Sequence, residues 1–387
     1  MKIMSAPPKA VPTVPGNSRP LWFFLLVIAL GLAARMAMAV LGHNYDMNSY
    51  RVVAGILEQG GNVYASTDRY NYGPIWFQVL HVLDFLAGQD PKVFRYLVAL
   101  FLSLVDIGIC LFLLRQFGQT VACLFFLNPV SIIITGFYSQ FDNLGILVAL
   151  LGVWLLGDEM DRPVNRRKFL ALVVIGLSIT TKHILFAFPF WLAVKQKGIG
   201  QKAIVMLVPV VVFLLSFAPY WHEGHEGIIR NVFEYRSMIN DYFYNMFVPL
   251  CIRDIYSANF FWFFCLTIFA FIYRSKTVLE SLLAYTCVLV AFSPAIAGQY
   301  LAIPIAFLAV RMNVLAVLYT IFAAWYLLIH PNGLSLSVMP WMSASFAVCT
   351  LAFVLAWATW KTSITVAVRF LYQWVRSEIK GQFGIKG

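Results

Sequence analysis

The residues of this chain best suited to chemistry are a few polar side chains placed between long apolar runs. Asp46 comes just after the first run, in the segment 42–73, which also holds two arginines and five tyrosines. A carboxylate in or beside a membrane is costly to keep, so Asp46 is a candidate functional acid. The alternative is a helix N-cap, because residues 48–58 have helical apolar spacing and polar residues often begin helices.

Further polar clusters interrupt the later apolar runs. For Asp142 the alternative to a binding role is again a helix cap. Lys182 can act as a point charge for a lipid phosphate, or its ammonium can reach the membrane interface by snorkelling without any such role. The clusters are Gln140, Asp142 and Asn143; Lys182 and His183; and Gln299 and Tyr300.

The elements that position these residues are expected to be membrane-spanning helices. The 387 residues are 61% hydrophobic and 12% charged, whereas a soluble domain carries about 25% charge. Many runs of 16 to 21 residues hold no charge, which suits a hydrocarbon core about 30 Å thick, while barrel strands would be about ten residues long and alternating. We predict an all-α, polytopic transmembrane bundle of about 11–13 hydrophobic segments, with an outer-face amphipathic helix after the first span. The runs are 21–41, 74–88, 97–114, 120–137, 141–157, 168–181, 183–194, 203–220, 257–273, 279–296, 300–310, 314–329 and 340–360.

The chain is predicted to consist of one membrane domain between two tails. Residues 1–20 are Pro-rich and basic, which is typical of a disordered cytoplasmic tail. Residues 21–360 form a single multi-span domain with a first outer loop at 42–73 and a large outer loop at 221–256. Residues 361–387 mix apolar residues with spaced cations, as in a cytoplasmic helix lying on anionic lipid.

The positive charges set the predicted orientation. Most of the 28 Lys and Arg residues cluster in the tails and in a few loops, which the positive-inside rule places in the cytoplasm. Asp46 and Asp142 then belong on the outer face, yet three apolar runs lie between residue 73 and Asp142. One run cannot be a full crossing, and we expect it to be 74–88, which is short and suits a re-entrant or tilted helix.

Several other polar features are assigned no chemistry. Asp106 lies mid-span, where a structural ion pair with Arg95 or Arg115 is expected. The stretch HEGHEG at 222–227 lacks the HExxH spacing of a zinc-binding helix, and its two glycines favour a loop. The six cysteines make no CxxC pair and are interpreted as packing residues. We predict no metal site.

The order of the polar motifs resembles that of the GT-C superfamily of membrane glycosyltransferases. The opening segment is most similar to the first mannosyltransferase of glycosylphosphatidylinositol synthesis and its bacterial relatives, in which an acidic D-x-D follows the first span and Y-R-Y-x-P leads into the second. The matching pieces here are NYD at 44–46 and DRYNYGPIW at 68–76. Later stretches, LNPVSIIIT with QFDN, TKHILFAFP and AGQYLAIPIAF, are also similar, so the resemblance covers about residues 20–310.

The resemblance implies roles for individual residues. It implies a polyprenyl-phosphate sugar donor and direct displacement with inversion at the anomeric carbon. The first acid of the D-x-D pair is Asn44 here, so a divalent metal is neither required nor excluded, and Asp46 is the expected general base. Lys182 or Arg69 would hold the donor phosphate. The other residues expected to bind substrate, some by stacking on sugar, are Asn44, Tyr70, Tyr72, Trp76, Gln140, Asp142, His183, Gln299 and Tyr300.

The predicted function is transfer of a hexose, for which mannose is one candidate, from the lipid-linked donor to a glycan or lipid acceptor on the outer or lumenal face. The expected partners are donor, acceptor and membrane lipids, without nucleic acid. A bacterial plasma membrane with a cytoplasmic N-terminus is favoured. The alternatives are a transporter or lipid flippase, for which internal repeats with broken helices would be expected, and a surface-glycan polymerase or ligase, for which several arginines would be expected in the large outer loop.

Overall fold

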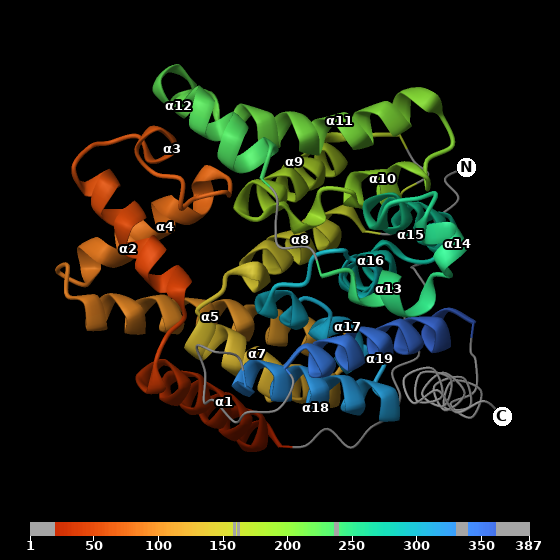
Figure 1. Ribbon diagram of the computed structural model, residues 1–387, viewed down its shortest axis with the longest axis horizontal. Helices are drawn as coiled ribbons and strands as arrows, with labels where there is room; N and C mark the ends of the chain where they lie inside the picture. Colours follow the sequence, from red (N-terminus) through yellow and green to blue (C-terminus); the bar gives the residue numbers. More distant parts are fainter. Residues whose placement is uncertain (1–19, 158–159, 161–162, 236–239, 330–339, 361–387) are drawn as a thin grey trace, which may run out of the picture.

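The computed structural model describes residues 20–157, 160, 163–235, 240–329 and 340–360, and every regular element in these ranges is helical (Figure 1). Both predicted tails and the loop 330–339 lie outside the described residues, apart from Pro20. The first half of the chain forms α1 (Leu21–Leu41), α2 (Tyr45–Glu58), α3 (Val63–Ser66), α4 (Pro74–Leu86), α5 (Pro91–Phe117), α6 (Gln119–Phe126), α7 (Pro129–Ile133), η1 (Ile134–Tyr138), α8 (Asp142–Leu156), α9 (Arg166–Thr181), η2 (His183–Leu185) and α10 (Phe188–Ala193). The second half forms α11 (Ile199–Leu215), η3 (Ala218–Tyr220), α12 (Trp221–Ile228), η4 (Ile229–Phe233), α13 (Tyr242–Phe247), α14 (Leu250–Arg253), α15 (Ala258–Ile272), η5 (Tyr273–Ser275), α16 (Val278–Ala291), η6 (Gly298–Ala302), α17 (Ile305–Val310), α18 (Val314–Ile329) and α19 (Pro340–Trp360).

The helices confirm the prediction of a polytopic helical membrane protein. Within the described ranges, five helices are long and apolar enough to cross a membrane, and shorter apolar helices pack between them. The five are Leu21–Leu41, Pro91–Phe117, Ile199–Phe233, Ala258–Ser275 and Ser343–Trp360.

The predicted single run 120–137 is broken in the structure. The segments Gln119–Phe126 and Pro129–Tyr138 are bent by 46° relative to each other. Pro129 lacks the N–H that would continue the first helix, and the Asn128 side chain accepts a hydrogen bond from the Val130 backbone, which caps a new one. The Asn128–Pro129 pair inside the apolar run was the sequence signal for this break.

Helices α2, α3 and α4 gather at one end of the bundle, beside α12 (left in Figure 1). Helix α2 matches the helix predicted over 48–58. Helix α4 has 13 residues, which gives about 20 Å at 1.5 Å per residue and falls short of a hydrocarbon core. Helix α4 alone therefore cannot provide a full crossing. The Glu58 side chain at the end of α2 accepts a hydrogen bond from Gln89, just beyond α4, so the ends of α2 and α4 lie together.

The HEGHEG stretch is helical, and the expectation of a loop was wrong. It lies in α12, which packs against α3. A Cβ atom at Gly227 would lie 1.8 Å from the Tyr64 carbonyl oxygen. The glycines are therefore needed because the backbones of the two helices approach closely, and they do not break the helix.

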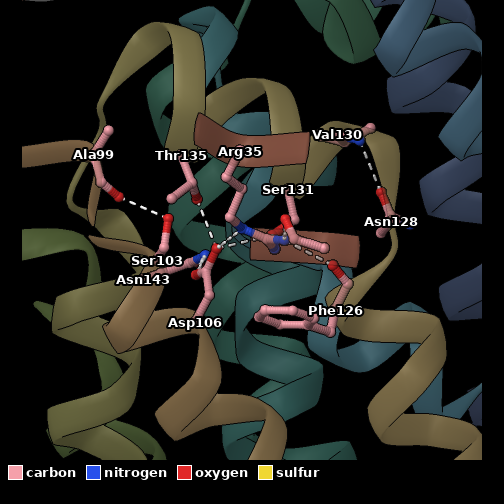
Figure 2. Close-up of polar contacts among 11 residues, drawn as sticks. Arg35, Ala99, Ser103, Asp106, Phe126, Asn128, Val130, Ser131, Thr135 and Asn143 are labelled. Carbon is pink, nitrogen blue, oxygen red and sulfur yellow. Dashed lines mark hydrogen bonds and ion pairs between the residues drawn. The ribbon is translucent and has the colours of Figure 1, made fainter. Parts of the chain in front are cut away.

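A buried ion pair joins the core helices, and its partners differ from those expected. The Nε atom of Arg35 on α1 lies 2.9 Å from Oδ2 of Asp106 on α5, and both side chains are fully buried (Figure 2). Arg95 and Arg115 lie on the same helix as Asp106, roughly 14–16 Å along its axis at 1.5 Å per residue, and therefore cannot reach it. Asp106 pairs with a residue of another helix because its carboxylate points away from the axis of α5 and reaches Arg35 on α1.

Candidate active site

Asp46 lies in the first turn of α2 and does not cap it. The N-cap position is Asn44, and neither side chain makes a capping hydrogen bond. Instead the Asn44 amide donates to Oδ2 of Asp46 at 3.0 Å, and the Gln140 amide donates to the same oxygen at 2.6 Å. The partly exposed Asp46 side chain has no hydrogen-bond partner at Oδ1 among the described residues.

Gln140 reaches Asp46 because the chain turns sharply after η1. Ser139 adopts a left-handed conformation with φ of 50°, which ends η1. The Gln140 amide also donates to the Tyr138 carbonyl at 3.3 Å. This second bond orients the Gln140 side chain toward Asp46. Helix α8 begins two residues later at Asp142, so Asp142 lies at the same end of the bundle as Asp46.

Lys182 forms a buried ion pair with Asp142. Its Nζ atom lies 2.6 Å from Oδ2 of Asp142, and the exposed fractions of the two side chains are 2% and 1%. The ammonium also lies 4.5 Å from the centre of the Phe141 ring and 5.2 Å from that of Tyr72, at cation–π distance. Lys182 therefore does not snorkel, and Asp142 binds Lys182 instead of capping α8, whose N-cap residue is Phe141. The other oxygen of Asp142 is buried without a described hydrogen-bond partner.

Tyr72 is held against this pair by the close approach of its loop to α9. A Cβ atom at Gly73 would lie 2.0 Å from the Thr180 carbonyl oxygen, so only glycine lets the loop lie so near. The Tyr72 ring stacks on His183 with ring centres 5.9 Å apart. Burial, followed by the charge of Asp46, raises the pKa of the Tyr72 phenol well above its usual value, so the group is neutral at physiological pH.

A cavity of about 620 Å³ opens beside Lys182. Five of the residues predicted from the sequence line it: Tyr72, Lys182, His183, Gln299 and Tyr300. Its wall is partly apolar, with Trp262 held by a 3.1 Å hydrogen bond from its indole to the Leu289 carbonyl. The cavity thus combines one buried cation with aromatic, amide and apolar surfaces.

Six of the residues expected to bind substrate do not line this cavity. Asn44 and Gln140 bind Asp46, and Asp142 binds Lys182. The other three are Arg69, Tyr70 and Trp76. Arg69 is exposed, and its guanidinium lies 5.2 Å from the centre of the Tyr45 ring. Tyr70 is buried, and its hydroxyl donates to the Gly73 carbonyl at 2.6 Å, which stabilises the turn before α4. Trp76 is fully buried and stacks on Phe141 at 4.4 Å. Tyr70 and Trp76 therefore stabilise the segments beside the cavity without lining it.

Six polar or aromatic residues of the cavity were missed from the sequence: Asn71, Phe186, Tyr235, Asn259, Trp262 and Ser293. Asn71 lies between two predicted tyrosines, and its position in that stretch was a usable signal. Trp262 resembles any aromatic residue of an apolar run, so nothing in the sequence distinguished it. Among the described residues, including HEGHEG, no group of three or more His, Cys, Asp and Glu side chains is placed to hold a metal ion.

The fold is similar to that of a solved protein structure. No family model matches the sequence, and no curated protein matches it. The crystal structure of ArnT from Cupriavidus metallidurans bound to undecaprenyl phosphate aligns with a TM-score of 0.50 at 15% identity, covering 86% of this chain and 76% of that one. At 15% identity this likeness shows a shared fold, and it agrees with the all-helical membrane architecture expected from the sequence.

Proposed function

We propose that this chain is a glycosyltransferase that moves a hexose, such as mannose, from a polyprenyl-phosphate donor to a hydroxyl of a glycan or lipid acceptor. The observation that carries the proposal is the pairing of two unlike groups at one end of a GT-C-like bundle. One group is a partly exposed carboxylate oriented by two amides, and the other is a buried ammonium beside a cavity.

Asp46 is the proposed general base. Its Oδ2 atom is occupied by the Asn44 and Gln140 amides, so Oδ1 is the oxygen left to accept a proton. As the acceptor hydroxyl attacks the anomeric carbon, its proton passes to Asp46. The same step breaks the bond from the anomeric carbon to the donor phosphate oxygen, so one glycosidic bond forms as one glycosyl–phosphate bond is lost.

Lys182 is the proposed ligand of the donor phosphate. The leaving polyprenyl phosphate gains negative charge during the reaction, and a fixed cation in a site shielded from water stabilises that charge. Asp142 fixes the ammonium in place from the buried side. The aromatic walls formed by Tyr72, Trp262 and Tyr300 suit the apolar faces of a sugar and the first isoprene units.

The comparison supplies independent support. ArnT is described with a bound undecaprenyl phosphate, and a lipid phosphate of this class suits a cavity that holds one cation and apolar walls. On the predicted orientation, the acceptor approaches Asp46 from the outer face of a bacterial plasma membrane, while the donor enters from the lipid.

The test is transfer from a labelled polyprenyl-phosphate hexose by purified wild type and Asp46→Asn. We expect kcat to fall about 10²–10⁴-fold, the usual contribution of a general base. Asp68→Asn is the matched control because Asp68 is an exposed acid of the same segment. Normal transfer by Asp46→Asn would remove Asp46 from the mechanism. A wild type that transfers nothing from any tested donor would favour the transporter or flippase alternative.

A further inference from the structure

We infer that Asp106, a buried carboxylate that does not line the cavity, is a positioning residue that aligns both halves of the proposed active site. The inference rests on the proposed function. Asp106 touches neither Asp46 nor Lys182, so any effect on transfer must act through the residues that it binds.

Both carboxylate oxygens of Asp106 are used, and by different parts of the chain. Oδ2 lies 2.9 Å from Arg35 Nε and accepts the Thr135 hydroxyl at 2.7 Å and the Ser131 hydroxyl at 3.3 Å. Oδ1 accepts the Asn143 amide at 2.6 Å. Figure 2 shows these side chains converging on Asp106. One carboxylate therefore joins α1, α7, η1 and α8 to α5.

Each of these contacts leads along the chain to a residue of the proposed site. Thr135 belongs to η1, which ends just before Gln140, and Arg35 belongs to the helix that precedes Asp46. The Oδ2 contacts therefore set the spacing between Asp46 and its amide donor. Asn143 directly follows Asp142, so the Oδ1 contact fixes the start of α8 and with it the ion pair to Lys182.

The directional bonds matter here more than the charge pairing. Arg35 also donates to the carbonyls of Gly31 and Phe126 at 3.1 and 2.9 Å, and to Ser131 at 2.9 Å. Replacing a buried ion pair by apolar residues of similar volume is often neutral or stabilising, so the pair is not needed for stability alone. Hydrogen bonds, unlike apolar contacts, specify where each segment lies relative to the next.

Two single variants separate the two halves. Thr135→Val keeps the shape and removes one bond to Oδ2, and we expect kcat to fall about tenfold with the KM for the donor unchanged. Asn143→Leu removes the bond to Oδ1, and we expect the donor KM to rise about tenfold. A displacement of about 1 Å can change rates by 10²-fold, so these effects are modest for a positioning role. The control is Ser103→Ala, because the buried Ser103 hydroxyl donates only to Ala99 of its own helix, at 2.7 Å.

A paired replacement separates positioning from stability. Arg35→Met combined with Asp106→Leu removes both charges, and we expect a folded protein that melts at a higher temperature than Arg35→Met alone and has at least tenfold lower kcat. Wild-type kcat in this variant, or unchanged kcat and KM in both single variants, would overturn the inference while leaving the proposed function intact. If the paired variant does not fold, the two single variants decide.

The proposed function fails separately, through a wild type that transfers no hexose. In that case direct binding of undecaprenyl phosphate to wild type and Asn143→Leu still tests the positioning of Lys182. About tenfold weaker binding by the variant supports the inference, and equal binding overturns it.

Discussion

The two buried acid–cation pairs in the described part of the chain have similar compositions and different surroundings. Arg35 and Asp106 meet in the core, where every carboxylate oxygen and several guanidinium nitrogens have partners. Lys182 and Asp142 meet at the edge of a cavity, where one Asp142 oxygen has no described partner and the ammonium lines the opening. A charge whose hydrogen bonds are all made orders the segments that it binds, whereas one bordering a cavity retains capacity for a ligand.

The largest effect is expected where the pair is most enclosed. Arg35→Met leaves Asp106 as a buried charge without its cation, and we expect the free energy of unfolding to fall by about 3–5 kcal/mol. Denaturant unfolding in detergent measures it. Arg115→Met is the control on α5, where an exposed cation should cost about 0–1 kcal/mol. Equal effects in the two variants would erase the distinction between the core pair and a surface charge.

The second prediction, for the cavity pair, concerns activity instead of stability. Lys182→Gln should lower kcat/KM about 10²–10³-fold, as for loss of a group that stabilises charge in the transition state. The protein should still be recovered folded, because the glutamine amide can donate to Asp142 in place of the ammonium. Lys168→Gln is the matched control, because Lys168 is also buried but lies near the start of α9, where it donates to the Met160 carbonyl away from the cavity. Comparable losses in both variants would indicate a general need for buried lysines in this part of the chain.

The smallest effect is expected for the neutral group beside the cavity pair. Tyr72→Phe removes one hydroxyl and should lower kcat/KM by about tenfold or less, the value of one hydrogen bond. Burial raises the pKa of the Tyr72 phenol above its ordinary value of about 10, so the phenol stays protonated between about pH 6 and 9. The pH–rate profile of the variant should therefore have the same shape as that of wild type over this range. A basic limb that disappears in the variant would show that Tyr72 titrates.

The sequence predicted the spans well where the apolar pattern was continuous. The first run, 21–41, coincides with α1, and the short run 74–88 corresponds to a helix too short to cross. Composition and periodicity suffice for such elements, because hydrophobic length is what a membrane selects. They failed at Asn128 and in HEGHEG, where one hydrogen bond or one close backbone contact decides the local structure.

The site was only partly predictable for a related reason. Polar residues in apolar surroundings made Asp46, Asp142 and Lys182 candidates, because each is costly unless it is paired or used. Which groups pair depends on how distant helices pack, so the sequence could not show that Lys182 binds Asp142 or that Arg35 binds Asp106. Trp262 and Asn259 of the cavity gave no signal because residues of their kinds are common near membrane interfaces.

The wall of the cavity formed by α15 has a consequence for kinetics. Trp262 lines the cavity, while Phe263 and Phe264 of the same helix are half exposed on its outer side. A single helix thus separates the cavity from surrounding hydrocarbon. A donor dissolved in the bilayer would search for the cavity in two dimensions, and turnover would follow its mole fraction among the lipids rather than its amount per volume of solution. Diluting the donor with inert lipid at fixed total donor should slow such an enzyme.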